Sequence, residues 1–380
     1  MKNRKGLAWL VAMLAVLSIT AAACGSSDSD GATTTTKAAG GSGDASTTTA
    51  APATDGLDKL SGTLNGGGSS FQDTFEQQVS ADFGTAVKDA GGSATITYTK
   101  SGSSDGKKGL ADKTLDFAGT DSPIKDEEKA SFGDRKMLYF PLVGGPISVA
   151  FNLDGVDSLN LSPDTIAGIF QAKITTWDDE AIKADNPDAD LPSTKITVVH
   201  RSDGSGTTSN FTKFLLAAAP DTWKLDAGET VNWPTTTQGA EKSTGVTTAI
   251  KATNGAVGYA DLADAAKEKL SVASIGNAEG DFIAPTPDNA SAALAGADVA
   301  DDLTYNPLNV EAKDAYPITS PTWILVDAVQ ADQGKADTIK AYLNYVLTTG
   351  QEQAKTLLYA PLPDDLAKKA IAQIDDITVG

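Results

Sequence analysis

Hydrophobic and polar positions after residue 57 follow two alternating periods, one typical of helices and one typical of strands. Apolar side chains recur every four residues from Phe71 through Phe75, Val79 and Phe83 to Val87, which predicts an amphipathic helix. Short alternating or continuous apolar runs predict strands at residues 58–65, 94–98, 115–121, 195–200 and 323–326. Helical spacing returns at residues 211–218, 341–347 and 364–374. Strands that alternate with helices indicate an α/β fold.

Two segments predict places where the chain crosses between lobes. Residues 138–152 form a long β-rich run that Gly144, Gly145 and Pro146 interrupt. Residues 316–321 precede the strand at 323–326 and predict a second crossing. The sequence therefore indicates two lobes rather than one.

Three turns rich in glycine and hydroxyl side chains each lead into a helix-like stretch. They are residues 66–71 (GGGSSF), 101–106 (SGSSDG) and 201–208 (RSDGSGTT). A helix start offers unpaired N–H groups and the positive end of the helix dipole, so it suits an anion. Three such turns suggest one oxyanion held by converging dipoles. Each turn alone is explained equally well by N-capping, for example by Ser69, Ser70 or Ser103.

The third turn carries the most chemistry. Arg201 can form a fork onto two oxyanion oxygens, and Asp203 is expected to orient it. Ser205 and Thr207 would provide hydroxyls, and Gly206 and Thr207 backbone N–H groups. The alternative is a plain strand–loop–helix turn in which Ser205 or Thr207 is only an N-cap.

Asp121 ends the predicted strand at 115–121 and restricts the kind of anion. A carboxylate beside an anion repels it, unless the anion carries a proton that the carboxylate can accept. The alternative is that Asp121 caps a helix opening at Pro123.

The charge balance excludes several classes of partner. The 380 residues include 30 basic and 50 acidic side chains, a net charge of −20, without a basic run in the body of the chain. Nucleic acid and anionic membrane surfaces are therefore not expected as partners. Anion binding remains compatible, because salt screens the net charge beyond about 8–10 Å. One histidine and one cysteine leave no soft metal site, and the carboxylates at residues 178–190 are interpreted as a solvated face.

Two sequence patterns imitate enzyme motifs. Residues 102–108 resemble a nucleotide-binding P-loop, but one residue is missing between the glycines, and Lys108 stands where serine or threonine must hold magnesium. His200 and Ser205 could suggest a hydrolase, but no Gly-x-Ser-x-Gly elbow is present. Strand alternation would also point His200 away from the side of Arg201. We expect no enzyme and no cofactor.

The first 57 residues predict a route out of the cytoplasm. Residues 1–23 are typical of a secretory leader rather than a transmembrane anchor, because the apolar run at 7–17 is short and ends in small residues. Cys24 resembles the lipid-accepting cysteine of bacterial lipoproteins, although Ala21 stands where that motif usually has leucine. Residues 24–57 are predicted to be a disordered tether, since residues 25–55 are almost wholly Ser, Thr, Ala, Gly and Asp.

Taken together, the segments resemble the substrate-binding protein of bacterial high-affinity phosphate ABC transporters. The similarity runs from about residue 60 to 366, and the string Arg-x-Asp-Gly-Ser-Gly-Thr at 201–207 is its most specific part. Further similar stretches are residues 116–123, 173–182, 254–259, 316–320 and 359–364.

The resemblance implies a two-lobed periplasmic-binding-protein fold of the two-crossover type (type II), with lobe I at 58–143 plus 318–380 and lobe II at 144–317. It also implies a site for one phosphate ion between the lobes. The residues carried over are Ser70, Phe71 through its backbone, Ser103, Asp121, Arg201, Asp203, Ser205, Gly206 and Thr207. The chain departs from the family at Ser70, where threonine is frequent, and at His200, where a second arginine can occur.

The implied function is extracytoplasmic binding of inorganic phosphate and its delivery to an ABC permease by a monomer, anchored to the membrane through lipid on Cys24. Two alternatives stay open. One is a receptor for another tetrahedral oxyanion, such as sulfate, molybdate or a phosphonate. The other is a secreted phosphomonoesterase, which would need a metal cluster or an activated nucleophile.

Overall fold

The computed structural model describes residues 56–380, so the predictions for the leader, for Cys24 and for the tether up to residue 55 lie outside the described residues. Leu57 was expected to end the tether, but it is buried and begins the 3-10 helix η1 (Leu57–Lys59). The predicted start of the body at residue 58 is therefore late. Within residues 56–380, none of the helices combines the length and apolar character needed to cross a bilayer.

Three parallel strands form one end of the main sheet, in the order β2-β1-β3: β2 (Thr95–Lys100), β1 (Thr63–Gly68) and β3 (Phe117–Thr120). β1 was predicted at 58–65; the structure moves it towards the carboxyl end, because η1 occupies the first positions. Helix α1 (Asp73–Ala90) follows β1, and α2 (Ser103–Ala111) follows β2. We call these strands and the helices around them the first lobe.

Helix α1 confirms the four-residue apolar period. Phe75, Val79, Phe83 and Val87 are all fully buried along it. Phe71 is buried as well but precedes the helix, which begins at Asp73. The period therefore identified the buried face correctly and placed the helix start too early.

At the other end of the sheet, β8 (Ala256–Asp261), β6 (Thr197–Arg201) and β7 (Gln238–Ala240) are parallel. Each precedes a helix: α8 (Leu262–Lys267), α6 (Gly206–Ala218) and α7 (Lys242–Lys251) respectively. We call these elements and those packed on them the second lobe. Both lobes thus repeat the strand–turn–helix unit that the sequence predicted.

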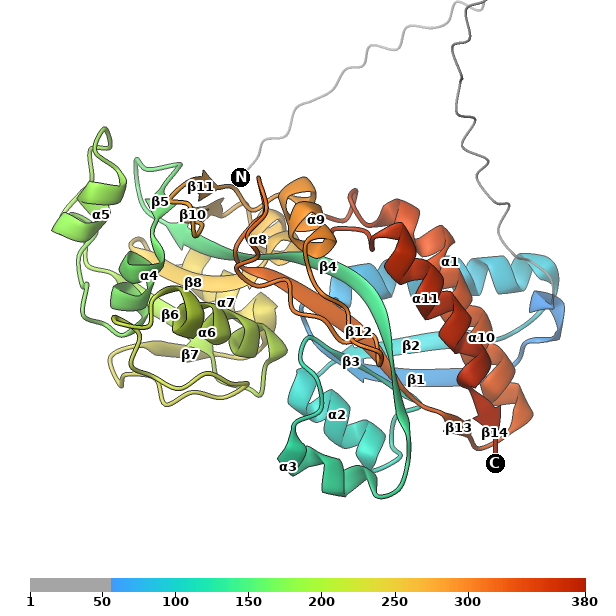
Figure 1. The fold of residues 1–380 in the computed structure, drawn as a ribbon. Coiled ribbons are helices and arrows are strands. Elements are labelled where there is room, and N and C mark those ends of the chain that lie inside the picture. Colours follow the sequence, from blue (N-terminus) through green and yellow to red (C-terminus); the bar gives the residue numbers. More distant parts are fainter. Residues whose placement is uncertain (1–55) are drawn as a thin grey trace, which may run out of the picture. The chain divides into compact units, whose positions relative to one another are not determined.

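Two long antiparallel strands join the lobes, as Figure 1 shows: β4 (Met137–Asn152) and β12 (Thr319–Asp327). β4 pairs with β12 along residues 137–146 and then with β8 along residues 147–152. This change of partner supports the predicted lobe boundaries at 143/144 and 317/318, which remain a proposal.

The predicted interruption of β4 at Gly144 and Gly145 is wrong, because the strand runs straight through them. Packing explains both glycines. A Cβ atom on Gly144 would lie 2.7 Å from the side chain of Leu294, and one on Gly145 would lie 3.2 Å from Phe71. The glycines therefore let neighbouring side chains approach the strand rather than break it.

The remaining elements in the first half of the chain are α3 (Asp126–Lys129), η2 (Ala130–Phe132), β5 (Asn160–Leu161), α4 (Pro163–Phe170) and α5 (Glu180–Asp185). In the second half they are β9 (Ser271–Val272), β10 (Ser274–Gly276), β11 (Phe282–Ile283), α9 (Pro287–Ala295), β13 (Val329–Gln330), α10 (Gln333–Leu347), η3 (Thr349–Gln353), α11 (Asp364–Gln373), η4 (Ile374–Asp376) and β14 (Thr378–Val379). Of these elements, β9 pairs with β4, while β11-β10-β5 and β13-β14 form two small separate sheets. The α/β prediction is confirmed.

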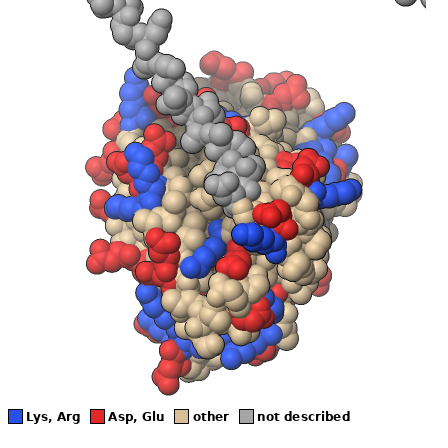
Figure 2. All heavy atoms as spheres, turned by 90° about the vertical axis from the view of Figure 1, so that its right-hand side faces the viewer, with Lys and Arg blue, Asp and Glu red and all other residues tan. Residues whose placement is uncertain are grey.

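The face drawn in Figure 2 carries basic and acidic side chains interspersed with uncharged ones. On that face neither sign of charge gathers into one large patch. Such a mixed surface agrees with a binding site whose charge is local rather than spread over the molecule.

Candidate functional site

The three predicted turns follow β1, β2 and β6, at the carboxyl ends of strands, where ligands bind in open α/β sheets. Asp121 directly follows β3 and is the acidic centre of this cluster, with 1% of its surface exposed. Elements of both lobes contact it. The structure therefore brings together residues that are separated by up to 138 positions along the chain, from Ser69 to Thr207.

Hydroxyl groups from both lobes donate to the Asp121 carboxylate. Ser69 Oγ donates to Oδ1 at 2.5 Å, and Thr207 Oγ1 donates to Oδ2 at 3.3 Å. The backbone of Asp121 is also fixed, since its N–H donates to Ser103 Oγ at 3.3 Å and its carbonyl accepts from Asn210 Nδ2 at 2.8 Å. The carboxylate is thus held in one orientation by its surroundings.

Burial raises the pKa of Asp121 from its ordinary value to about 7. The hydrogen bond from Ser69 and the positive charge of Arg201 act in the opposite direction but do not outweigh burial. Near neutral pH this group can therefore hold or accept a proton. That property is what the sequence-based hypothesis requires of it.

Arg201 and Asp203 form a bidentate ion pair. Arg201 Nε donates to Asp203 Oδ1 at 2.7 Å, and Arg201 Nη2 donates to Oδ2 at 2.5 Å. Burial alone would raise the pKa of Asp203, but Arg201 and Lys242 hold it well below its usual range. The backbone N–H of Arg201 donates to the Tyr259 hydroxyl at 3.2 Å. The Arg201 guanidinium group is therefore buried and oriented. Asp203 orients it, which is the role that the sequence predicted for this residue.

Helix α6 begins at the third turn. Ser205 Oγ accepts from the Thr208 N–H at 3.1 Å, so Ser205 is an N-cap, as the alternative interpretation of this turn held. This role leaves the Ser205 hydroxyl hydrogen, together with the Gly206 and Thr207 N–H groups, available for an anion. A Cβ atom on Gly206 would lie 2.6 Å from Ser103 Oγ and 2.7 Å from Asp121 Cβ. The helix start therefore lies directly against the first lobe.

The first turn differs from the expectation in detail. Ser70 Oγ lies 3.2 Å from Ser243 Oγ and accepts from the Ser243 N–H at 3.2 Å, at the start of α7. The Phe71 N–H donates to Ser69 Oγ at 3.0 Å. Neither serine caps α1, whose first residue is Asp73 and whose N-cap position is Gln72. Ser69 contacts Asp121, although it is not among the predicted site residues. The adjacent serines at 69 and 70 could have indicated it, because either hydroxyl can occupy this position of the turn.

The alternative role of Asp121 as a helix cap is wrong. No helix opens at Pro123; α3 begins at Asp126, with Lys125 at its N-cap position. His200 stacks on Trp233, with ring centroids 4.9 Å apart, and its Nδ1 lies 2.9 Å from the Arg201 carbonyl. Its ring therefore packs on aromatic surface rather than against Ser205.

Lys242 and Glu229 also belong to the cluster, although no sequence motif predicted them. The Lys242 N–H donates to Asp203 Oδ1 at 3.0 Å, and Lys242 Nζ donates to the Ser101 carbonyl of the first lobe at 2.6 Å. Glu229 contacts Ser104 at 2.7 Å. Both are charged side chains in loops or at helix ends, positions from which sequence alone assigns no contact.

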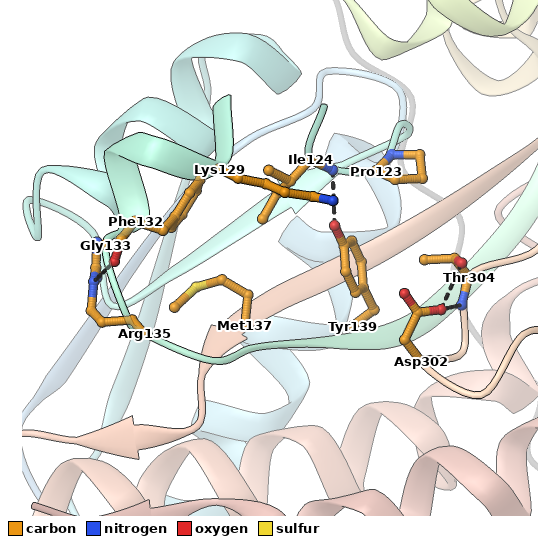
Figure 3. Close-up of a pocket in the computed structure, with 10 residues that line it drawn as sticks. All are labelled: Pro123, Ile124, Lys129, Phe132, Gly133, Arg135, Met137, Tyr139, Asp302 and Thr304. Atoms are coloured by element: carbon orange, nitrogen blue, oxygen red, sulfur yellow. Dashed lines mark hydrogen bonds between the residues drawn. The ribbon is translucent and has the colours of Figure 1, made fainter. Parts of the chain in front are cut away.

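A separate cavity of about 360 Å³ lies beside Tyr139, as Figure 3 shows. Ile124, Phe132 and Met137 give it an apolar lining, and the Tyr139 hydroxyl accepts from the Ile124 N–H at 2.8 Å. Asp302 stands at its edge. Its lining contains none of the predicted site residues.

Among residues 56–380, no group of three or more His, Cys, Asp or Glu side chains is arranged to hold a metal ion. The donors of the cluster are hydroxyl, amide and guanidinium groups instead, a set that suits an oxyanion.

Comparison with known proteins gives the same picture from an independent direction. A family model described as a PBP superfamily domain matches residues 45–349. A protein of Methanocaldococcus jannaschii named phosphate-binding protein PstS is 37% identical over 309 residues, 74% of this chain and 79% of the relative. The protein of the same name from Xylella fastidiosa (strain Temecula1) is 33% identical over 312 residues, 80% of this chain and 83% of the relative.

Solved structures share the fold. A high-affinity periplasmic phosphate-binding protein with bound phosphate superposes with a TM-score of 0.69, covering 82% of this chain and 94% of its own, at 22% identity. A phosphate-binding protein from Stenotrophomonas maltophilia superposes with a TM-score of 0.63, covering 82% and 93%, at 20% identity. These neighbours have the two-lobed periplasmic-binding-protein fold. The chain belongs to the PBP superfamily and, within it, to the family of phosphate-binding proteins PstS.

Proposed function

We propose that this chain binds inorganic phosphate outside the cytoplasm and delivers it to the permease of an ABC transporter. The relatives named phosphate-binding protein PstS support this assignment. The observation that carries it is the buried carboxyl of Asp121, with a pKa near 7, close to the charge of Arg201. Asp121 can accept a proton, and Arg201 attracts negative charge. Near neutral pH, phosphate carries both a proton and negative charge.

In the proposed site, each of the nine residues has one role. Arg201 supplies the charge and Asp203 orients it. Asp121 accepts the phosphate proton. The remaining donors are the hydroxyls and N–H groups of Ser70, Phe71, Ser103, Ser205, Gly206 and Thr207. Ser69 is added here, because its hydroxyl donates to Asp121.

Discrimination against sulfate follows from the same proton. Sulfate is fully ionised near neutral pH, so it has no proton for the ionised form of Asp121 and would leave that charge unpaired. Leaving such a buried polar group unpaired costs about 1–3 kcal/mol, and more when the group is charged. We propose binding without turnover, since the relatives carry the names of binding proteins and not of enzymes.

We further propose that residues 1–23 are removed as a signal peptide and that Cys24 carries the lipid that anchors the protein at the outer face of the cell membrane. The leader-like sequence and the position of Cys24 after three alanines support this part. We also propose a monomer. Mass spectrometry of the purified protein would detect the lipid on Cys24, and a free Cys24 in the mature protein would contradict the anchor.

Calorimetry of the purified protein with phosphate and with sulfate tests the central proposal. We expect tight phosphate binding at neutral pH and sulfate binding weaker by several orders of magnitude. Equal binding of both ions would remove the proton-acceptor role of Asp121 and favour a general oxyanion receptor. Hydrolysis of a chromogenic phosphate ester would favour a phosphomonoesterase.

A further inference from the structure

Glu229, in the segment between α6 and β7, places its buried side chain among donors that all come from the opposite lobe. Its exposed fraction is 2%. Ser104 Oγ and Lys107 Nζ of α2 lie 2.7 and 2.8 Å from its carboxylate oxygens. Ser122 Oγ and Lys125 Nζ, from the segment after β3, lie 2.5 and 3.5 Å away. One carboxylate therefore joins four side chains of the first lobe.

The backbone of Glu229 is attached to the candidate anion site. Its carbonyl accepts from the Ser205 N–H at 3.0 Å, at the start of α6. On the other side, Ser122 directly follows Asp121 in the chain. The same residue thus supports the anion-binding turn of one lobe and reaches the segment that carries the acidic residue of the other.

The charges around Glu229 suit a contact that forms and breaks. Lys107 is 2% exposed and has a second partner in its own lobe, Glu128, at 2.7 Å. If the lobes separated, Lys107 would keep Glu128, and Glu229 would regain water. Burial tends to raise the pKa of Glu229, but Lys107 and the surrounding hydroxyls lower it to about 2, so the group stays ionised near neutral pH. The attraction therefore acts mainly when the lobes touch.

We propose that Glu229 is a positioning residue that holds the two lobes together around the bound anion. This inference rests on the proposed function, and it adds a residue that would control how long the anion stays bound. Contacts of this kind act after encounter, because diffusion of the ion does not depend on them. Their loss changes the dissociation rate more than the association rate.

The first test compares phosphate binding by the full-length protein and its Glu229→Gln variant. We expect the variant to bind phosphate at least about 30-fold more weakly, mainly through faster release in stopped-flow measurements, with association within about threefold of the parent. Glu268→Gln is the matched control, since Glu268 pairs with Lys251 at 2.7 Å and neither belongs to this cluster. We expect it to leave binding within about twofold.

A second pair of variants tests the ion pair itself. Lys107→Met and Glu229→Gln remove the same interaction. The double variant is therefore expected to bind phosphate about as weakly as the single variant with the lower affinity. Independent, additive losses would contradict the pair. Lys125→Met removes a half-exposed partner and is therefore expected to fold normally, with phosphate release about two- to fivefold faster.

Hydrogen exchange without phosphate separates this inference from the proposed function. The Ser104 N–H donates to the Gly204 carbonyl across the lobes at 3.4 Å, so its exchange reports lobe contact. We expect faster exchange at Ser104 in Glu229→Gln, while exchange within α10 stays unchanged. If the parent binds phosphate, the inference would be overturned by a Glu229→Gln variant that exchanges Ser104 or releases phosphate at the same rate as the parent. A parent that binds no phosphate would overturn the proposed function instead, and exchange at Ser104 alone would then decide about Glu229.

Discussion

In the proposed site, Asp121 would combine acidity with a role in anion binding. Its carboxylate accepts from two hydroxyls, Ser69 and Thr207, which come from different lobes. A bound oxyanion with a proton can donate to the carboxylate, and the hydroxyls can turn towards the anion. In the proposed site, the ionised group would therefore accept a hydrogen bond only from a ligand that arrives with its own hydrogen.

Replacing Asp121 by asparagine is expected to reduce discrimination between phosphate and sulfate. The amide can donate to a sulfate oxygen that the carboxylate repels, and it no longer takes the phosphate proton as well. From the cost of an unpaired buried polar group, we expect the ratio of sulfate Kd to phosphate Kd to fall by about 5- to 150-fold in calorimetry. Asp116→Asn, at a residue paired with Lys335, is the control. An unchanged ratio in Asp121→Asn would contradict the role of the proton.

At the scale of elements, the start of α6 would have two tasks in the proposed site. Its N-cap, Ser205, satisfies the Thr208 N–H and so stabilises the helix. The same turn lies directly against Asp121 and Ser103, as the short distances from a Cβ atom built on Gly206 indicate. A structural cap and an anion-binding turn are therefore compatible in one sequence.

Ser205→Ala and Thr286→Ala separate these two tasks. Thr286 caps α9 by accepting from the Asn289 N–H at 3.2 Å. Each substitution is expected to lower the free energy of unfolding by about 1 kcal/mol, measured by denaturant titration without phosphate. Only Ser205→Ala should weaken phosphate binding, by about tenfold, because it also removes a donor hydroxyl. Equal phosphate affinities in the two variants would assign Ser205 to capping alone.

Gly206→Ala tests the close approach of α6 to the first lobe. The new methyl group would lie 2.6 Å from Ser103 Oγ, so the lobes must move apart for it to fit. We expect phosphate affinity to fall by at least about tenfold, since a displacement of this size disturbs every donor of the turn. Gly84→Ala in α1 is the control, because apart from the adjoining backbone of α1 nothing lies within 4 Å of the added Cβ. It should raise stability by about 0.4–1 kcal/mol and leave affinity unchanged.

At the scale of the whole molecule, fully buried carboxyl groups link stability to pH, among them Glu76 and Asp121, and burial raises the pKa of Asp261 as well. Burial raises the pKa of Glu76 to about 7, as it does for Asp121. Glu76 lies in the core of the first lobe, where Tyr342 Oη donates to it at 2.5 Å. In both cases the folded protein binds a proton more tightly than the unfolded chain. Stability is therefore greatest below the ordinary carboxyl pKa and decreases as pH rises towards 7.

Without phosphate, we expect the free energy of unfolding to decrease between pH 5 and pH 7 by up to about 1.4 kcal/mol per pH unit for each of these groups. Glu229 does not offset this, because its pKa is lowered and its contribution is lost only towards pH 2. Glu76→Gln should reduce the slope in denaturant titrations and leave phosphate affinity within about twofold. A slope identical to that of the parent would show that Glu76 does not titrate in this window.

The sequence by itself determined the α/β class, the two crossings, the buried face of α1 and the turns that carry Asp121 and Arg201. These features follow from local periodicity and from turn chemistry, which act over a few residues. Local pattern also misled. Gly144 and Gly145 do not interrupt β4, because their small size serves packing against Leu294 and Phe71.

Only the tertiary structure decided which side chains meet. Ser69 rather than Ser70 reaches Asp121, and Glu229 pairs with Lys107, a residue that in sequence belongs to an imitation of a P-loop. The pKa of Asp121 also depends on burial by both lobes. These contacts join residues far apart along the chain, Ser69 with Asp121 and Lys107 with Glu229, and no local pattern in one chain specifies them. The chemical types of the donors could therefore be predicted from the sequence, whereas their arrangement in space could be seen only in the folded structure.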